Sequence, residues 1–252
     1  MIMKLLKSIT FLLSAPRCVC CRERLDFGDR GLCKACMVEY ENNKERDCSR
    51  CAKKLSFCSC PSSYLLSRKI RRHAKVYRYS YQKNESPANK IIYALKEANR
   101  SDVFEFLADE LADAIRNSLG LKPDKLEYLI TSVPRRAGAI RKFGYDHARE
   151  IGRRVAKRLG IKYRLLLKSR AKKPQKGMMG EERRENAIFA CRRKAPSMKG
   201  IRVIIIDDIV TTGASVGRCA ELIRSLGARE VMSASVAIAY KDAYTPPATS
   251  WF

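Results

Sequence analysis

One segment in the carboxyl-terminal third of the chain limits the possible folds most narrowly. Residues 203–206 are four β-branched apolar side chains, and Asp207 and Asp208 follow directly. Such a run is typical of a parallel strand that is buried on both faces. A loop rich in hydroxyl groups comes next, and residues 216–226 then keep helical spacing up to Gly227, a residue typical of helix ends. This order of elements predicts one unit of an open α/β sheet.

The residues between this strand and this helix suit a phosphorylated sugar. Open α/β sheets bind ligands beyond the carboxyl ends of their strands. Gly213 allows the backbone to approach a phosphate, and the amides that begin a helix point toward an anion. Asp207 and Asp208 would repel that phosphate, so we expect them at the other end of the ligand. There they can accept hydrogen bonds from ribose hydroxyls or hold a metal-bound water.

The same segment resembles the phosphoribosyl-pyrophosphate (PRPP) motif of type I phosphoribosyltransferases. That motif is a hydrophobic strand, two acids, a hydrophobic pair and Thr-Thr-Gly-x-Ser, and it matches residues 203–215 without a break. The alternative is an ordinary buried strand whose two aspartates cap the following turn. The resemblance implies these PRPP-binding residues: Asp207, Asp208, Thr211, Thr212, Gly213, Ala214 and Ser215.

The composition indicates a polyanionic partner. The chain has 252 residues, enough for one α/β domain and a small module. Its 52 Lys and Arg against 26 Asp and Glu give a formal net charge of +26. So large an excess favours nucleic acid as a partner, although a merely soluble basic surface is the alternative.

The amino-terminal residues argue against export. No apolar run reaches the length of a membrane span. Lys4 and Lys7 precede a short apolar run, which resembles a weak signal peptide. Because that run is short and cysteines follow at once, we expect an amphipathic helix packed on its own protein. We therefore predict a cytoplasmic location.

Nine of the eleven cysteines fall between Cys18 and Cys60, and their spacing predicts metal sites. Two residues between cysteines let both thiolates reach one tetrahedral Zn²⁺. The first quartet predicts one Zn²⁺ and the tighter second quartet allows another. A disulfide scaffold and a crossed pairing of the knuckles are the alternatives. The proposed ligands are Cys18, Cys21, Cys33 and Cys36 for the first site, and Cys48, Cys51, Cys58 and Cys60 for the second.

The rest of the chain predicts alternating strands and helices. A half-exposed strand is expected over 76–81, two helices over 87–115 with a break at 99–102, a strand over 127–133, a helix over 145–159 and a strand over 231–239. Alternation of this kind predicts a mostly parallel sheet flanked by helices. We expect a cysteine-rich module at 1–62, a basic linker at 63–75, the α/β domain at 76–240 and a tail at 241–252.

Two further segments bear on ligand binding. Arg135 and Arg136 follow the strand that ends at Val133, where they can meet a pyrophosphate. Residues 168–189 are long and highly charged, which favours a lid; a solvated loop without a role is the alternative.

Taken together, the layout resembles the ComF family of phosphoribosyltransferase-like proteins. It has a cysteine module, a strand ending in Val-Pro, an Arg-rich turn, a lid and the PRPP strand. Phe143-Gly144-Tyr145-Asp146-His147 departs from the Arg-Gly-Phe-Asn-Gln that this family commonly carries. The resemblance implies a type I phosphoribosyltransferase-like fold, Mg²⁺ with PRPP, single-stranded DNA handling in natural competence, and a helicase partner. It also implies roles for Lys96 on the domain's first helix and for the lid residues Gln175, Arg183, Arg184 and Asn186.

Two classes of function follow. The first is a DNA-uptake protein that binds PRPP and single-stranded DNA. The alternative is a salvage phosphoribosyltransferase that transfers ribose 5-phosphate from PRPP to a nitrogenous base, with Asp207 and Asp208 as catalytic residues. Salvage predicts a defined base as acceptor and release of pyrophosphate, whereas the DNA-uptake hypothesis predicts neither.

Overall fold

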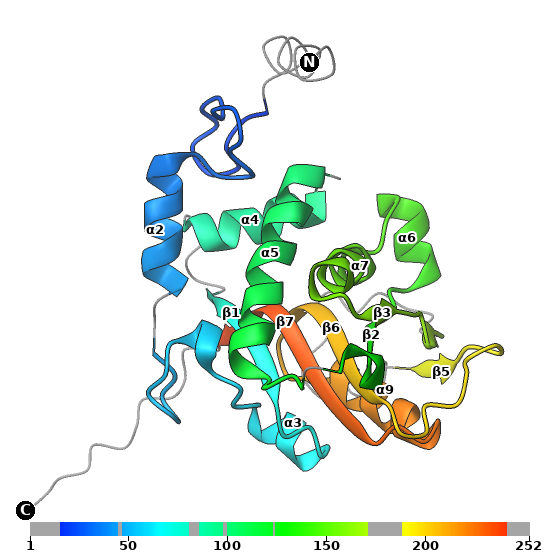
Figure 1. Ribbon diagram of the computed structural model, residues 1–252. Helices are drawn as coiled ribbons and strands as arrows, with labels where there is room; N and C mark the ends of the chain where they lie inside the picture. Colours follow the sequence, from blue (N-terminus) through cyan, green and yellow to red (C-terminus); the bar gives the residue numbers. More distant parts are fainter. Residues whose placement is uncertain are drawn as a thin grey trace, which may run out of the picture.

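A five-stranded parallel sheet forms the centre of the protein, with strand order β1-β7-β6-β2-β3 (Figure 1). The computed structural model describes residues 16–44, 47–80, 86–97, 100–122, 124–170 and 188–240. The strands are β1 (His73–Ser80), β2 (Tyr128–Ser132), β3 (Lys162–Tyr163), β6 (Arg202–Val210) and β7 (Glu230–Tyr240). A separate antiparallel pair consists of β4 (Leu167–Ser169) and β5 (Phe189–Cys191). The predicted α/β class with a mostly parallel sheet is confirmed.

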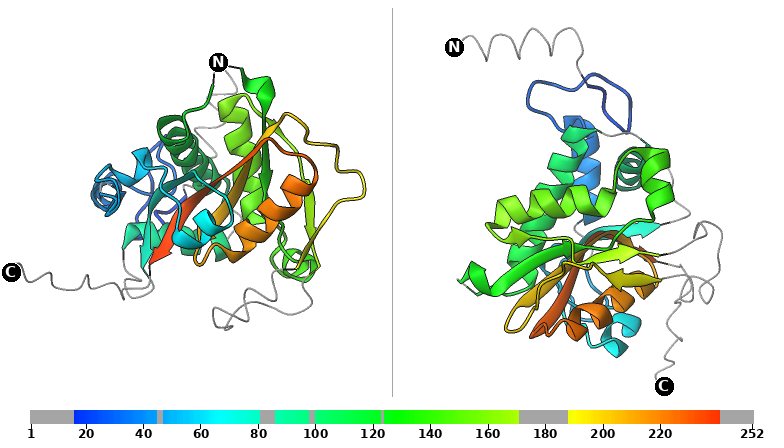
Figure 2. Two further views of the ribbon diagram at one scale, coloured as in Figure 1. Left: turned by 90° about the horizontal axis from the view of Figure 1, so that it is seen from below. Right: turned by 90° about the vertical axis from the view of Figure 1, so that its right-hand side faces the viewer.

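Helices cover both faces of the sheet (Figure 2). One face carries α4 (Pro87–Glu97), α5 (Ser101–Ser118) and α7 (His147–Leu159), and the other carries α3 (Ser63–Ser67) and α9 (Ala214–Ser225). α2 (Lys34–Lys44) packs beside α4. The other described helices are α6 (Ala137–Phe143) and the short 3₁₀ turns Leu55–Phe57 and Lys125–Glu127.

The β-branched run on β6 explains why the sheet is covered on both sides. Ile204 and Ile206 pack into the cluster with α5 and α7, while Val203 and Ile205 pack into the cluster with α9. All four side chains are buried. The predicted helix over 145–159 also appears as α7, and it ends at Gly160 in the left-handed conformation with φ of 65°.

Two strands differ from the expectation. β6 does not end before the acids but continues to Val210, because β7 keeps pairing with it as far as Ile238. β1 is not half-exposed: it begins at His73, and residues 73–77 are all buried. Cover from α5 on one side and from the cysteine module on the other makes this edge strand part of the core.

The basic linker expected over 63–75 is an ordered part of the fold. Its residues form α3 and the start of β1, and Leu65 and Ile70 are fully buried. Ser62 caps α3 by accepting a hydrogen bond from the Leu65 amide at 3.2 Å. Arg68 forms an ion pair with Glu221 of α9. These tertiary contacts outweigh the basic composition that favoured a linker; the domain boundaries stay a prediction.

Three predicted features lie outside the described residues. They are the amino-terminal helix, the tail at 241–252 and the lid residues Gln175, Arg183, Arg184 and Asn186. Among the described residues, no helix is long and apolar enough to cross a membrane.

Candidate functional site

Parallel pairing of β2 with β6 brings the predicted basic and acidic residues to one edge of the sheet. Ser132 pairs with Ile206, and the Val133 amide donates to the Ile206 carbonyl at 2.9 Å. The chain after β2, with Arg135 and Arg136, therefore leaves the sheet beside the carboxylates at the end of β6. Both arginines are half-buried.

A chain of polar contacts joins the two segments. Nη1 of Arg135 lies 3.1 Å from the ring nitrogens of His147, and Nδ1 of His147 lies 3.7 Å from Oδ2 of Asp208. Asp146 caps α7 by accepting from the Arg149 amide at 3.3 Å, and it also accepts from the Arg135 amide at 3.1 Å. The start of α7 thus fixes the orientation of the turn that carries Arg135.

Asp207 occupies the most unfavourable environment for a charge in this site. The burial of its carboxyl group and the neighbouring Asp208 carboxylate raise its pKa well above the ordinary value of 3.8. Asp146 adds to the same effect. Three acids close to one another suit a ligand that brings hydroxyl donors or a divalent cation.

Replacing Asp207 by Asn is expected to stabilise the ligand-free protein at neutral pH. Its pKa is higher in the folded state, so the folded state binds more protons and the free energy of unfolding falls as pH rises above about 4. We expect Asp207→Asn to raise the melting temperature at pH 8 by roughly 2–4 °C, or about 1 kcal/mol, with no gain below pH 4. Thermal melts at both pH values test this, with the exposed Asp113→Asn as control. Identical melting of native and Asp207→Asn protein at pH 8 would contradict the assignment.

The loop after β6 has the expected composition, but its glycine has another structural role. Gly213 has φ of 83°, and a Cβ there would lie 2.8 Å from Cδ2 of Leu65 on α3. Only glycine fits both the left-handed backbone and this contact. The structure thus requires Gly213 for the contact with α3, whereas the sequence suggested an approach to a phosphate. Thr212 accepts a hydrogen bond from the Ala214 amide at 3.3 Å and shapes the start of α9.

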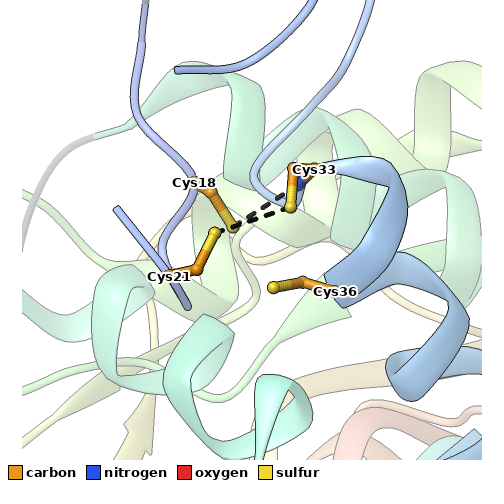
Figure 3. A group of neighbouring side chains, drawn as sticks. All are labelled: Cys18, Cys21, Cys33 and Cys36. Carbon is orange, nitrogen blue, oxygen red and sulfur yellow. Dashed lines mark hydrogen bonds between the residues drawn. The ribbon is translucent and has the colours of Figure 1, made fainter. Parts of the chain in front are cut away.

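The first cysteine quartet is assembled as predicted (Figure 3). Its four sulfurs come from the knuckle at 18–21 and from the start of α2, and they lie within 4.8 Å of one another. Sγ of Cys21 lies 3.6 Å from Sγ of Cys33. Bonds of about 2.3 Å in a tetrahedron place sulfurs roughly 3.8 Å apart, so the quartet fits one divalent cation.

Backbone amides prepare this quartet for a metal. The amides of Cys20 and Cys33 each donate to Sγ of Cys18 at 3.4 Å. Burial alone would raise the pKa of the Cys18 thiol, but such hydrogen bonds outweigh it and lower that pKa to about 7. None of the eleven cysteines, all within the described residues, forms a disulfide.

The sulfurs of the second quartet also lie within 4.8 Å of one another, and this quartet has a cationic neighbour. Sγ of Cys51 lies 3.5 Å from Sγ of Cys58. Nζ of Lys75, a buried residue of β1, donates to Cys58 Sγ at 3.1 Å and to the Cys60 carbonyl at 2.8 Å. A positive charge at this position offsets the charge of the thiolates and connects the quartet to the sheet. This contact has no local signal in the sequence, because Lys75 lies 17 residues from Cys58.

The cysteine module shares its core with the α/β domain. Tyr40 of α2 is fully buried, and its ring makes edge contacts with Tyr77 of β1 and Phe106 of α5. Leu25 and Leu32 are buried in the same cluster, whereas Phe27 and Val38 are exposed.

Known proteins resemble this chain over most of its length. Residues 146–251 match the family model described as the phosphoribosyl transferase domain. Competence protein F of Haemophilus influenzae is 25% identical over 219 residues, which cover 85% of this chain and 93% of that protein. DNA utilization protein YhgH of Salmonella typhimurium is 27% identical over 222 residues, with the same two coverages. These similarities support the ComF family, which the layout of the sequence resembles. A crystal structure of adenine phosphoribosyltransferase aligns with a TM-score of 0.36 at 21% identity, covering 55% of this chain and 71% of that one.

The chain departs from the motif common in the ComF family at a position that contacts the site. Asp146 and His147 stand where the family commonly has Asn and Gln, and both are buried between Arg135 and Asp208. Lys96 lies on α4, but its side chain lies outside the described part of the structure. The site therefore rests on the residues of β6, its loop and the turn after β2.

Proposed function

We propose that this chain binds PRPP at the edge where β2 and β6 end. The observation that supports the proposal is their parallel pairing: Ser132 lies opposite Ile206, so the turn with Arg135 and Arg136 follows β2 next to the residues that follow Ile206. In this assignment the loop amides and hydroxyls bind the 5′-phosphate. The two arginines bind the pyrophosphate, and the aspartates accept hydrogen bonds from the ribose hydroxyls.

A divalent cation fits the same site. Mg²⁺ prefers oxygen ligands and usually keeps several waters, so the carboxylates can hold it through water while PRPP supplies phosphate oxygens. Calorimetric titration with PRPP and Mg²⁺ tests the proposal. We expect saturable binding of one PRPP per chain, and no binding at millimolar PRPP would contradict it.

We also propose that both cysteine quartets hold Zn²⁺. The spacing of their sulfurs supports this, since four thiolates at tetrahedral spacing are a ligand set typical of structural zinc. In that role the metals stabilise the module and provide no step in a reaction.

We propose further that the chain binds single-stranded DNA during DNA uptake, next to a helicase. The names of the two relatives support this proposal, as does an observation on β4 and β5. Antiparallel pairing of these strands brings together two basic stretches, at 164–170 and 192–194, that lie apart in the sequence. We call this β4–β5 pair the ribbon. Exposed cations lie on and beside it: Arg164, Lys168, Arg170, Arg192, Arg193 and Lys194.

The ribbon can be tested through the salt dependence of DNA binding. For single strands the slope of log K against log salt is about −0.7 per neutralised phosphate. Replacing Arg192, Arg193 and Lys194 by Ala should therefore flatten the slope by about 2 and weaken binding at low salt. Fluorescence anisotropy with labelled oligothymidine measures both quantities.

A matched control removes the same charge elsewhere. Arg116, Arg153 and Lys157 are exposed on α5 and α7, and their triple Ala variant should keep the native slope. Equal slopes for the two triple variants would show that the ribbon is not the contact surface.

A further inference from the structure

A pocket separates the second cysteine quartet from the ends of β6 and β7. Its volume is about 270 Å³. Cys48 and Cys60 form part of one wall, and Thr211, the first residue of the phosphate loop, forms part of another. The pocket thus lies between the cysteine module and the proposed PRPP site, and neither assignment above uses it.

The lining of this pocket is cationic and rich in hydroxyl groups. Arg50, Lys75 and Arg78 all line it, and no carboxylate does so among the described residues. A divalent cation held by four thiolates carries a net charge of −2, so three cations leave the walls positive. The hydroxyl groups belong to Ser49, Ser62, Ser63 and Thr211.

We propose that this pocket binds a nucleotide unit through its phosphate. Arg50 is the main phosphate ligand in this assignment. One of its amino groups, Nη1, donates to the Pro61 carbonyl at 2.6 Å, which fixes the side chain across the pocket. A guanidinium carries five N–H donors and matches phosphate oxygens in pairs, so Arg50 can bind a phosphate while it keeps this contact.

The apolar part of the pocket suits the rest of a nucleotide. Leu55, Leu65, Val210 and Ile238 line the pocket together with the polar groups. Small-molecule sites commonly combine such apolar walls with a few polar groups that fix the orientation of the ligand. A sugar and base can contact these apolar side chains while the phosphate binds the cations.

The position of Thr211 connects the pocket to the proposed PRPP site. A nucleotide here would lie beside PRPP rather than in its place, as an acceptor or a partner ligand. The placement of the nucleotide beside PRPP rests on the proposed PRPP site, whereas nucleotide binding itself does not. A free nucleotide and the phosphorylated end of a DNA strand offer the same chemistry, so the experiment must separate them.

Calorimetric titration of the full chain with deoxyadenosine monophosphate, both without PRPP and at saturating PRPP and Mg²⁺, tests the proposal. We expect Arg50→Glu to weaken binding at least about tenfold, since a charged hydrogen bond is lost and a repulsion gained. Arg229→Glu is the matched control, because it makes the same charge change at an exposed position away from the pocket. It should change the affinity by less than about twofold. Thr211→Val is a milder second variant that should also weaken binding. Zinc content and melting temperature show that each variant is folded.

Oligonucleotides distinguish the two sources of the nucleotide. If the pocket binds a strand end, 5′-phosphorylated hexathymidine should bind more tightly than its unphosphorylated form. Arg50→Glu should then abolish this difference. Binding of the monophosphate alone assigns it to free nucleotides. The proposal is overturned if the monophosphate does not bind or if both Glu variants weaken its binding equally. The placement beside PRPP is overturned if saturating PRPP abolishes monophosphate binding. The Asp207→Asn/Asp208→Asn variant separates the sites, since it should lose PRPP and still bind the monophosphate.

Discussion

Loss of metal from the first cysteine quartet is expected to lower the melting temperature of the whole chain by more than about 10 °C. Structural Zn²⁺ contributes about 10–16 kcal/mol to the folding of small zinc-finger peptides. Here Cys18, Leu25 and Tyr40 belong to the same buried cluster as α5 and β1. Without the metal this part of the cluster is exposed, so the loss reaches the α/β domain.

Cys33→Ala tests this expectation, with Cys20→Ala as its matched control. Cys20 lies within the knuckle at 18–21 but belongs to neither quartet. We expect Cys33→Ala to lose one metal per chain and to melt at least about 10 °C lower, while Cys20→Ala keeps both metals and melts within a few degrees of the native protein. Mass spectrometry of the native protein gives the metal count. A Cys33→Ala protein with native metal content and melting temperature would refute the metal site.

Gly213→Ala is expected to destabilise the protein by about 2–5 kcal/mol, from left-handed strain and overpacking against Leu65. Gly200 provides a close control, because its φ of 81° nearly equals the 83° of Gly213 and a Cβ there meets nothing within 4 Å. Gly200→Ala should therefore show only the backbone strain, about 1–2 kcal/mol.

A double-mutant cycle with Leu65→Ala separates packing from strain. If α3 contacts the loop as observed, Gly213→Ala should destabilise a Leu65→Ala background less than the native background, by about 1 kcal/mol or more. Urea denaturation of the four proteins measures this difference. Additive effects would mean that α3 does not press on the loop in solution.

The sequence predicted those parts of the fold whose signals are local. Four β-branched residues in a row predicted β6, and Gly160 marked the end of α7. α3 was missed because its order depends on distant partners: Leu65 packs on Gly213, and Arg68 pairs with Glu221. The burial of β1 was missed for the same reason, since its cover comes from α5 and the cysteine module.

In the candidate site, too, local features could be predicted from the sequence and long-range contacts could not. Cysteine spacing predicted which sulfurs lie together, since each knuckle is a local structure. The contact between His147 and Asp208 joins segments 61 positions apart in the sequence, and strand order alone decides it. The pocket beside Thr211 likewise arises from four separate segments and has no sequence signature.

The central claim is that the edge beside Asp207 and Asp208 binds PRPP, and a thermal melt tests it most directly. A ligand that binds only the folded state adds about 2.7 kcal/mol of stability at one hundred times its dissociation constant. The native protein should therefore melt roughly 5–10 °C higher with PRPP and Mg²⁺, and Asp207→Ala/Asp208→Ala should show no such rise. An equal rise in both proteins would place PRPP elsewhere, and no rise in the native protein would contradict the claim.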